Sequence, residues 1–359
     1  MKLFSNIYHS KRVLVTGHTG FKGSWLTLWL HQLGAEVTGI ALPPEMQPNH
    51  WDILKLPTID LRLDIRDIST LQKTIDEIKP EIVFHLAAQP LVRRSYLNPI
   101  ETWAVNVMGT ANVLEACRNQ PSVRAIVAIT TDKCYENQEW HWGYRENDRL
   151  GGHDPYSASK ACAELLVSSY RHAFFHAESA PLLATARAGN VIGGGDWSKD
   201  RLIPDLVRAL HTKDSLEIRS PYATRPWQHV LESLSGYLSL GQKLLEGNRQ
   251  FSDAWNFGPE PESNRSVSEV LSKLEQQWEH LRWHVTQAQQ PHEALLLHLD
   301  SSKAKKLLQW QPVWGIDTTL SKTADWYRAY LSNGKLMSHA QLYEYISDAC
   351  IAKIHWAYS

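Results

Sequence analysis

The feature that most constrains the fold of this chain is an apolar strand that ends in a glycine-rich turn and leads into a helix. Residues 12–16 form a short β-branched run, residues 17–23 read Gly-His-Thr-Gly-Phe-Lys-Gly, and a helical pattern follows at 24–33. A strand, a glycine turn and a helix in this order begin a dinucleotide-binding unit. A second strand, expected at 36–41, completes a βαβ unit. The chain is therefore predicted to build a Rossmann-type, doubly wound parallel sheet of the α/β class.

Each glycine of the turn has its own task. Gly17 permits the tight turn, Gly20 lets the backbone approach a pyrophosphate, and Gly23 lets the helix pack close to the strand. The phosphates would lie at the positive N-terminus of the helix. The turn residues expected to contact the cofactor are Gly17, Thr19, Gly20, Phe21, Lys22 and Gly23.

The second strand departs from the usual fingerprint, because no acid follows it to bind the ribose hydroxyls. The chain continues Ala41-Leu42-Pro43-Pro44, with no arginine for a 2′-phosphate either, which favours NAD over NADP. After the next predicted strand, at 59–63, Asp64 and Ile65 are candidates to frame the adenine. A helix cap is the alternative for Asp64, and both interpretations stay open.

Two further segments are expected near the cofactor. An apolar strand at 81–88 ends in Leu86 and the small residues Ala87 and Ala88, which would let the cofactor pass close to the backbone. A long helix predicted at 101–119 contains Asn106. That asparagine is either a surface residue or a bracket for the active-site loop.

The strand predicted at 125–129 is followed at once by polar residues. Thr130, Thr131, Asp132 and Lys133 begin where the apolar run ends. Their hydroxyl, carboxyl and ammonium groups would therefore lie at the carboxyl edge of the sheet, where open α/β folds bind ligands.

A helix predicted from residue 156 to about residue 176 carries Tyr156 and Lys160. Four residues apart, the two side chains differ by only about 40° and lie on one face of the helix. A nearby ammonium group favours the phenolate, which makes Tyr156 a candidate base for a hydroxyl proton. The alternative is an ordinary amphipathic helix with a surface tyrosine and lysine.

The composition excludes several classes of function. Lys plus Arg number 37 against 38 acids, so the net charge of −1 gives no field that would recruit nucleic acid or an anionic membrane. No apolar run is long enough for a membrane span, and no signal-peptide core is seen at the N-terminus. The four cysteines have neither disulfide nor metal-ligand spacing. We expect a cytoplasmic protein with a small-molecule partner, reduced thiols and no metal.

The carboxyl-terminal half is expected to supply a lid and substrate specificity. A strand at 182–186 leads into the loop at 187–197, which contains Asn190, three consecutive glycines, Asp196 and Trp197. Such a sequence forms a poor strand or helix but suits a loop over a ligand.

Several arginines follow this loop. Arginine forks match diphosphate oxygens, so Arg201, Arg219 and Arg225 are candidates to bind a diphosphate. Arg208, on a helix flank, is expected instead on a solvated face.

Later segments are expected to complete a smaller α/β lobe. They are a strand at 255–257, a helix at 267–280, a strand at 295–299, and helices at 303–308 and 316–330. The predicted Rossmann domain spans residues 1–188, with 228–258 returning to it. The predicted substrate lobe spans 189–227 and 259–359.

Together these motifs resemble the extended short-chain dehydrogenase/reductase family that acts on nucleotide sugars, across nearly the whole chain. The resemblance rests on residues 16–23, 86–88, Asn106 and the Tyr156-to-Lys160 segment. More narrowly, three runs are similar to the 4,6-dehydratases that act on cytidine diphosphate glucose. These runs are residues 131–135, 187–197 and 225–232 (Arg-Pro-Trp-Gln-His-Val-Leu-Glu).

The resemblance implies NAD as a tightly held cofactor and CDP-D-glucose as the substrate. The implied product is CDP-4-keto-6-deoxy-D-glucose, a precursor of deoxy sugars in surface polysaccharides such as the lipopolysaccharide O-antigen. A homodimer, or a tetramer built from dimers on a helical interface, is also implied.

The implied chemistry begins with oxidation at C4, because a ketone there acidifies the C5 proton. Tyr156, assisted by Lys160 and oriented through Thr131, would take the C4 hydroxyl proton. Lys133 would then take the C5 proton, and Asp132 would protonate the departing C6 hydroxyl. The expected catalytic residues are Thr131, Asp132, Lys133, Tyr156 and Lys160.

Other residues are expected to bind the two ligands. Beyond the glycine turn, those expected at the cofactor are Asp64, Ile65, Leu86, Ala87, Ala88, Asn106, Thr130, Tyr156 and Lys160. Those expected at the substrate are Gln89, Asn190, Asp196, Trp197, Arg201, Arg219, Arg225 and Gln228.

The chain departs from the related dTDP-glucose dehydratases in two respects. Those enzymes have Asp-Glu where this chain has Asp132-Lys133, and they have an additional diphosphate arginine in the carboxyl-terminal lobe, a role that Arg201 or Arg219 would take here. Two other functions are alternatives to a dehydratase. An epimerase or decarboxylase of the same family has no use for an acid–base pair at Asp132 and Lys133. A non-catalytic dinucleotide-binding protein would not need the tyrosine, lysine and threonine together.

Overall fold

The computed structural model describes residues 2–278, 281–286 and 295–358. At its centre is a parallel sheet of seven strands in the order β11-β6-β5-β4-β1-β2-β3. The strands are β1 (Arg12–Thr16), β2 (Glu36–Ala41), β3 (Ile59–Arg62), β4 (Ile82–His85), β5 (Ala125–Ile129), β6 (Leu182–Ala188) and β11 (Ala254–Phe257). The strand order reverses between β1 and β4, which is where a doubly wound sheet binds its ligand. The predicted fold class is confirmed.

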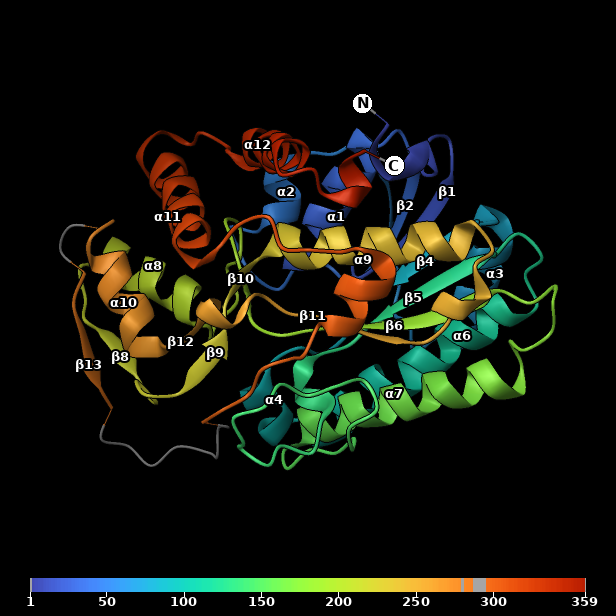
Figure 1. Cartoon of the computed structure of the whole chain (residues 1–359), viewed down its shortest axis with the longest axis horizontal. Helices are drawn as coiled ribbons and strands as arrows, with labels where there is room; N and C mark the ends of the chain where they lie inside the picture. Colours follow the sequence, from blue (N-terminus) through green and yellow to red (C-terminus); the bar gives the residue numbers. More distant parts are fainter. Residues whose placement is uncertain (1, 279–280, 287–294, 359) are drawn as a thin grey trace.

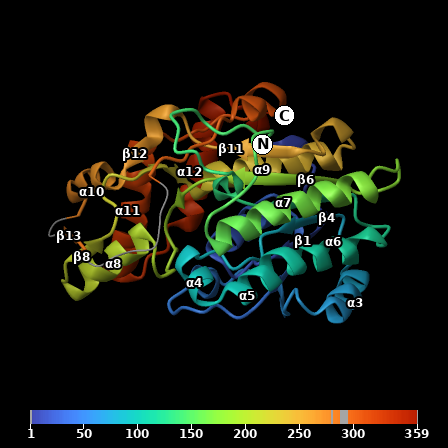
Figure 2. The ribbon, with the colours of Figure 1, turned by 90° about the horizontal axis from the view of Figure 1, so that it is seen from below.

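Helices cover both faces of this sheet, as Figures 1 and 2 show. One face is covered by α1 (Phe21–Gln32) and α9 (Val230–Leu245), and the other by α3 (Ile68–Ile78), α6 (Thr110–Arg118) and α7 (Pro155–Ala173). Alternate residues of β1 therefore enter different cores. Val13 and Val15 pack in the cluster beneath α1 and α9, whereas Leu14 packs in the cluster beneath α3 and α6.

A smaller group of elements forms a lobe at the left of Figure 1. Its strands pair as β8 with β13 and β9 with β12, and β10 pairs with β7 where the lobe joins the main sheet. The elements of the lobe and of this joint are β7 (Val191–Ile192), α8 (Leu202–Thr212), β8 (Leu216–Ile218), β9 (Thr224–Pro226), β10 (Gln228–His229), β12 (Asn264–Ser266), α10 (Val267–Glu275), β13 (Trp283–Val285) and α11 (Ile316–Asn333).

The last helix, α12 (Ser338–Ile351), lies on α1 rather than within the lobe. Tyr345 packs edge-on against Trp29, and Trp356 stacks on Phe4 with ring centroids 5.0 Å apart. The two ends of the chain therefore lie side by side, as Figure 1 shows. The division into two domains stays a prediction.

Short helical segments complete the described chain. The α-helical ones are α2 (His50–Leu54), α4 (Val92–Leu97) and α5 (Pro99–Trp103), and the π-helical ones are Ala104–Gly109 and Ala304–Leu308. The 3-10 segments are Leu3–Asn6, Asp132–Cys134, Arg249–Phe251, Pro261–Ser263 and His355–Ala357. Within the described ranges, none of the helices has the length and apolar content needed to cross a bilayer.

Three expectations about secondary structure need correction. The strand predicted at 295–299 is wrong: Leu297 and Leu299 instead pack under the segment that follows β5, and only Leu299 makes a bridge, to Tyr144. The strand at 255–257, named among the lobe segments although it falls within the predicted return of residues 228–258 to the main domain, is β11 of the main sheet, where it pairs with β6. The helix predicted at 267–280 ends at Glu275, and residues 279–280 lie outside the described chain.

The long helix predicted at 101–119 is helical but not uniform. It consists of α5, the π-helical segment Ala104–Gly109 and α6. A π turn carries an extra residue, which changes the direction in which a side chain points. Asn106 lies within this turn and is 1% exposed, so the surface interpretation of Asn106 is wrong.

Candidate active site

A cavity of about 1000 Å³ lies between the carboxyl edge of the sheet and the lobe. Segments that follow β1 to β5, the start of α7 and parts of the lobe all contribute to its lining. Of the predicted site residues, the following line it: Gly17, Thr19, Gly20, Phe21, Lys22, Gly23, Asp64, Ile65, Leu86, Ala87, Ala88, Gln89, Thr130, Thr131, Asp132, Lys133, Tyr156, Lys160, Asn190, Asp196, Trp197, Arg201, Arg219 and Arg225. Asn106 and Gln228 are the two predicted residues that do not.

The glycine turn is shaped as a dinucleotide site requires. Gly17 has a φ of +75°, and a Cβ there would lie 2.7 Å from the backbone nitrogen of Ala87, so a larger residue would be both strained and obstructed. Gly20 has no side chain over the N-terminus of α1, a helix of 12 residues that starts at Phe21. Open backbone at a helix N-terminus fits the pyrophosphate of a dinucleotide.

Asp64 is held by an arginine beside it. Its carboxylate accepts bonds from the Arg66 backbone nitrogen at 2.9 Å and from the Arg66 side chain, and the guanidinium lowers the pKa of Asp64. The cap of α3 is Asp67, whose side chain accepts from the backbone of Thr70. The interpretation of Asp64 as the cap of this helix is therefore wrong, and its carboxylate lines the cavity beside Ile65.

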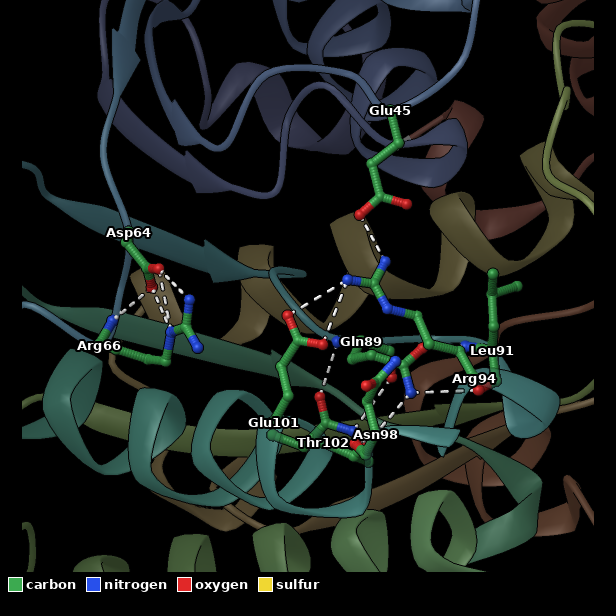
Figure 3. A network of polar contacts seen from close by, with 10 residues as sticks. Glu45, Asp64, Arg66, Gln89, Leu91, Arg94, Asn98, Glu101 and Thr102 are labelled. Atoms are coloured by element: carbon green, nitrogen blue, oxygen red, sulfur yellow. Dashed lines mark hydrogen bonds and ion pairs between the residues drawn. The ribbon is translucent and has the colours of Figure 1, made fainter. Parts of the chain in front are cut away.

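A second cluster of charges lies on the same side of the cavity. Figure 3 shows Arg94 of α4 between Glu45, from the loop after β2, and Glu101 of α5. The Arg94–Glu101 pair has a nitrogen–oxygen distance of 3.2 Å. All three residues line the cavity, and sequence reasoning missed them because their pairing joins segments that are far apart in the chain.

Gln89 and Asn106 bind one another rather than reach a ligand together. The Asn106 side chain accepts from the Gln89 backbone nitrogen at 2.8 Å and donates to the Gln89 carbonyl and to Ser159. The Gln89 side chain donates to Thr102 and to the carbonyl of Leu91. Of the two interpretations of Asn106, the structure therefore favours the bracket: its side chain joins the loop after β4 to α7.

Three of the predicted catalytic side chains meet in a chain of contacts. The Thr131 hydroxyl donates to Asp132 Oδ1 at 2.9 Å, and Thr131 lies close enough to the Tyr156 phenol to lower its pKa. Asp132 is 1% exposed, and its Oδ2 has no hydrogen-bond partner within the described chain. This buried oxygen lies against Gly189, which also lines the cavity.

Lys160 and Tyr156 are both deeply buried, and burial sets their acidity. Burial lowers the pKa of Lys160 to about 8, and the carboxylate of Glu164 opposes that decrease. Burial raises the pKa of Tyr156 to about 12, against the effect of the Thr131 hydrogen bond. The pKa of the phenol thus lies above its ordinary value, opposite to the direction expected from Lys160 alone. The Lys160 ammonium donates to the Ile129 carbonyl at 3.3 Å.

Lys22, a residue of the glycine turn, also lies near the predicted catalytic residues. Its ammonium donates to the Tyr237 hydroxyl of α9 at 3.2 Å, and burial lowers its pKa to about 7. It also interacts electrostatically with Asp132 and Lys160. The sequence placed Lys22 only at the cofactor, because nothing in the turn indicates how near it lies to the strand-end carboxylate.

In the lobe, two predicted substrate residues are paired with each other. Arg201 lies 2.9 Å from the Asp196 carboxylate at the start of α8. Trp197 is largely buried among Trp326, Tyr327 and Tyr330 of α11, so most of its ring is packing surface. Asn190, Arg219 and Arg225 line the cavity, and Arg225 is 7% exposed.

Two further lobe predictions differ from the structure. Gln228 is buried away from the cavity, where its side chain donates to the Phe257 carbonyl. Arg208 does not lie on a freely solvated face, since it donates to the carbonyls of Trp197 and Ser198. The loop that contains the glycine run lines the cavity, and the run itself packs against α11: a Cβ at Gly194 would lie 1.9 Å from the Trp326 ring.

The most informative omission is a buried pair, Glu164 of α7 and Arg187 of β6, whose charged groups lie 2.7 Å apart. Glu164 follows Lys160 by four residues, as Lys160 follows Tyr156, so all three share one helix face. That spacing was a signal in the sequence for Glu164, whereas nothing local marks Arg187 as its partner.

The parallel sheet and the glycine turn after its first strand define a dinucleotide-binding α/β protein of the Rossmann type. The sequence profile of the GDP-mannose 4,6 dehydratase family matches residues 14–323. The chain is 48% identical over 351 residues to a CDP-glucose 4,6-dehydratase of Salmonella typhimurium, a match that covers 95% of this chain and 98% of the relative.

Solved structures agree with this relationship at the level of fold. An epimerase from Methanothermobacter thermautotrophicus has a TM-score of 0.81 at 24% identity, covering 92% of this chain and 96% of the other. A dTDP-glucose 4,6-dehydratase from Streptomyces venezuelae, solved with NAD bound, has a TM-score of 0.75 at 22% identity, covering 88% and 96%. The chain belongs to the GDP-mannose 4,6 dehydratase family.

Proposed function

We propose that this chain is an NAD-dependent CDP-glucose 4,6-dehydratase, a lyase that converts CDP-D-glucose to CDP-4-keto-6-deoxy-D-glucose and water. The observation that carries the proposal is the meeting of Thr131, Asp132 and Lys133 with Tyr156 and Lys160 at one cavity. The 48% identity to a relative of that name supports the choice of substrate. An epimerase or decarboxylase would share Tyr156 and Lys160 but would not need Asp132 and Lys133.

The glycine turn, with Asp64 and Ile65 farther along the cavity, is the place for NAD. When bound, NAD would supply a hydride acceptor for C4 and a hydride donor for C6, and its positive ring would favour the Tyr156 phenolate. Tyr156 takes the proton of the C4 hydroxyl in the same step. Lys160, four residues on, assists by keeping a positive charge on this face of α7.

Elimination then needs an acid and a base at neighbouring carbons. Lys133, in its neutral form, takes the C5 proton that the C4 ketone has made acidic. Asp132, in its protonated form, gives its proton to the C6 hydroxyl, which leaves as water. Lys133 afterwards returns a proton to C5 when C6 is reduced.

Thr131 offers a path that returns the proton gained by Tyr156 to Asp132 at the end of the cycle. After one turnover Tyr156 carries the proton from the C4 hydroxyl, and Asp132 has lost its own. Thr131 donates to Asp132 and lies close enough to Tyr156 to lower the pKa of the phenol, so transfer from phenol to hydroxyl to carboxylate restores the starting forms. No proton is left over in this cycle.

The diphosphate is assigned to arginines of the lobe. Arg225 lies at the cavity on β9 and is mostly buried, which makes a charged contact there strong. Arg201 and Arg219 also line the cavity, and Arg201 lies near enough to Tyr156 to interact with it electrostatically. Arg225 is therefore assigned to the diphosphate, with Arg219 as the second cation and Arg201 nearer the sugar.

The cellular setting follows from the same proposal. The enzyme acts in the cytoplasm, on a route to deoxy sugars of surface polysaccharides such as the lipopolysaccharide O-antigen. It is a homodimer or a tetramer built from two dimers. Exposed apolar side chains on α4, α5, the π-helical segment Ala104–Gly109 and α7, elements that pack on one another (Figure 2), support a helical interface. They are Tyr96, Leu97, Ile100, Met108 and Leu165.

The test is turnover of defined nucleotide sugars by the purified chain. With CDP-D-glucose we expect a product lighter by one water that forms an enone chromophore in alkali, and we expect NAD in the ligand released on denaturation. UDP-glucose, dTDP-glucose and GDP-mannose serve as competing substrates, and Tyr156→Phe as the inactive control. A product of unchanged mass would indicate an epimerase, and loss of carbon dioxide from a uronic acid substrate would indicate a decarboxylase.

A further inference from the structure

A buried ion pair lies directly behind the predicted catalytic loop. Glu164 of α7 and Arg187 of β6 are each 3% exposed, and their charged atoms lie 2.7 Å apart. Tyr156, Lys160 and Glu164 follow one another at intervals of four residues, so Glu164 continues the catalytic face of the helix into the interior.

Glu164 fixes the start of the catalytic loop. Its Oε1 accepts a hydrogen bond from the Thr130 hydroxyl, and its Oε2 accepts one from Thr185 at 2.8 Å. Thr130 is the first residue after β5 and directly precedes Thr131. The carboxylate therefore holds the strand end from which Thr131, Asp132 and Lys133 project.

Arg187 fixes the other end of the same segment. Its guanidinium donates to the Tyr135 hydroxyl at 2.7 Å and to the Glu146 carbonyl at 3.0 Å, and it lies 5.0 Å from the centre of the Tyr135 ring. Tyr135 in turn donates to Asn256 of β11. Residues 130–135 are thus held at both ends by one ion pair.

We propose that Glu164 and Arg187 form a positioning pair for the dehydration, which clamps both ends of segment 130–135 and sets the charge that Lys160 experiences. This inference rests on the proposed function, since the segment carries the acid and the base of that reaction. Neither residue lines the cavity. Both therefore act through Thr130, Tyr135 and Lys160 rather than on the substrate.

The charged groups around Lys160 support the proposal that Glu164 sets the charge that Lys160 experiences. Residues i and i+4 on a helix are neighbours, and the Glu164 carboxylate opposes the effect of burial on the pKa of Lys160. Cys134 and His85 also face Lys160, but burial raises the pKa of the thiol and lowers that of the imidazole to about 3, so both are neutral. Lys22 adds a repulsive charge when protonated.

Glu164 itself is held as a carboxylate. Arg187 and the two threonine hydroxyls lower its pKa, against the effect of burial. Arg171 also faces it from α7. Glu164 therefore supplies a constant negative charge behind Lys160 throughout the neutral range.

A purely structural ion pair would give a different signature. Breaking such a pair leaves a buried charge without a partner, which lowers stability at every pH. Loss of a charge that supports Lys160 changes the pH at which Lys160 loses its proton. The pH profile of kcat/KM, which reports groups of the free enzyme, separates the two roles.

The experiment compares Glu164→Gln with the parent enzyme, with CDP-D-glucose as substrate. Activity of the parent should fall as pH rises through the pKa of Lys160, because the ammonium is the active form. In Glu164→Gln that fall should move about one pH unit lower, as expected for loss of an opposite charge nearby. The decrease in kcat should exceed the increase in KM, since the pair does not touch substrate.

Two controls keep charge and packing apart. Glu164→Asp retains the carboxylate and should restore the pH profile at a lower Tm. Thr185→Val removes one hydrogen bond to the same carboxylate and should leave the profile in place. If Glu164→Gln fails to fold, the double variant Glu164→Gln, Arg187→Gln removes both charges of the pair, leaves neither without its partner, and should show the same displaced profile.

An unchanged pH profile in Glu164→Gln, or in the double variant, would overturn the inference and leave the pair a structural contact. Failure of the proposed function would be seen separately, because the parent enzyme would then form no 4-keto sugar from CDP-D-glucose at any pH.

Discussion

Arg225 and Arg94 line the same cavity from different parts of the fold, and they differ in how much water surrounds them. Arg225, on β9 of the lobe, is 7% exposed, whereas the side chain of Arg94, on α4, is 31% exposed and pairs with Glu45, which is 65% exposed. The same contrast separates the Glu164–Arg187 pair behind the catalytic loop from the Asp64–Arg66 pair beside the glycine turn.

This difference predicts where substitutions matter. Exposed ion pairs contribute about 0–1 kcal/mol because water screens them, whereas breaking a buried pair costs about 3–5 kcal/mol. The substrate end of the cavity should therefore depend strongly on single charged residues. The glycine-turn end, where backbone and small residues hold the ligand, should tolerate the loss of a charge.

The largest effect is expected at the catalytic loop, for Lys133→Met. Tyr156 and Lys160 remain, so C4 can still be oxidised, but the C5 proton cannot be removed. Turnover should fall about 10²–10⁴-fold, the usual contribution of a general base. A single turnover should show reduced-nicotinamide absorbance that persists, with little solvent deuterium at C5.

Lys133→Arg is the matched variant, because it keeps a cation but not a base of suitable pKa. It should be as slow as Lys133→Met. Normal deuterium incorporation at C5 in either variant would assign this step to another group. Glu136, a carboxylate three residues after Lys133, is paired with Arg149.

An intermediate effect is expected for Arg225→Ala. Loss of a charge-assisted contact to the diphosphate should cost about 1.5–3 kcal/mol, which is roughly a 10–150-fold increase in KM, with a smaller change in kcat. Inhibition by free CDP should weaken to the same extent. Arg265, opposite Arg225 in the β9–β12 ladder, does not line the cavity, so Arg265→Ala should leave KM unchanged. Unaltered affinity for both ligands in Arg225→Ala would contradict the assignment.

The smallest effect is expected for Arg94→Ala. Its pairs with Glu45 and Glu101 join two segments that line the cavity beside the glycine turn, so NAD should dissociate about 2–5-fold faster, as for a loss of up to ~1 kcal/mol. At high salt, which screens exposed charges, the rate of NAD dissociation from Arg94→Ala should equal that from the parent enzyme. Arg118→Ala breaks an exposed pair with Glu115 and should leave NAD dissociation unchanged. A change in NAD dissociation by Arg94→Ala as large as the change in KM by Arg225→Ala would contradict the predicted difference between the glycine-turn end and the substrate end of the cavity.

Most of the sheet and most of the residues that line the cavity could be predicted from the sequence. Strands β1 and β5 were predictable because each is a short run with an apolar centre that ends at a glycine or a polar residue, at Gly17 and Thr130. The polar residues at those strand ends also gathered at one cavity, since parallel strands share a carboxyl edge. The apolar run at 295–299 has the same composition but packs under a loop, and periodicity alone does not separate the two.

Charge pairing between distant segments was not predictable. Arg187 meets Glu164, and Arg94 meets Glu45, only after the chain has folded, and no local pattern encodes either pair. Burial also reversed one expectation: the pKa of Tyr156 lies above its ordinary value because desolvation exceeds the effect of neighbouring groups. Such balances depend on three-dimensional surroundings.

The central claim is that one cavity oxidises C4, eliminates water and then reduces C6 of the same sugar. Incubation of the purified chain with CDP-D-glucose deuterated at C4, followed by mass and NMR analysis, tests it most directly. We predict that the deuterium appears at C6 of a 4-keto-6-deoxy product, with no stoichiometric consumption of added NAD. Deuterium that remains at C4 in a sugar of unchanged mass, or is released to solvent, would contradict the claim.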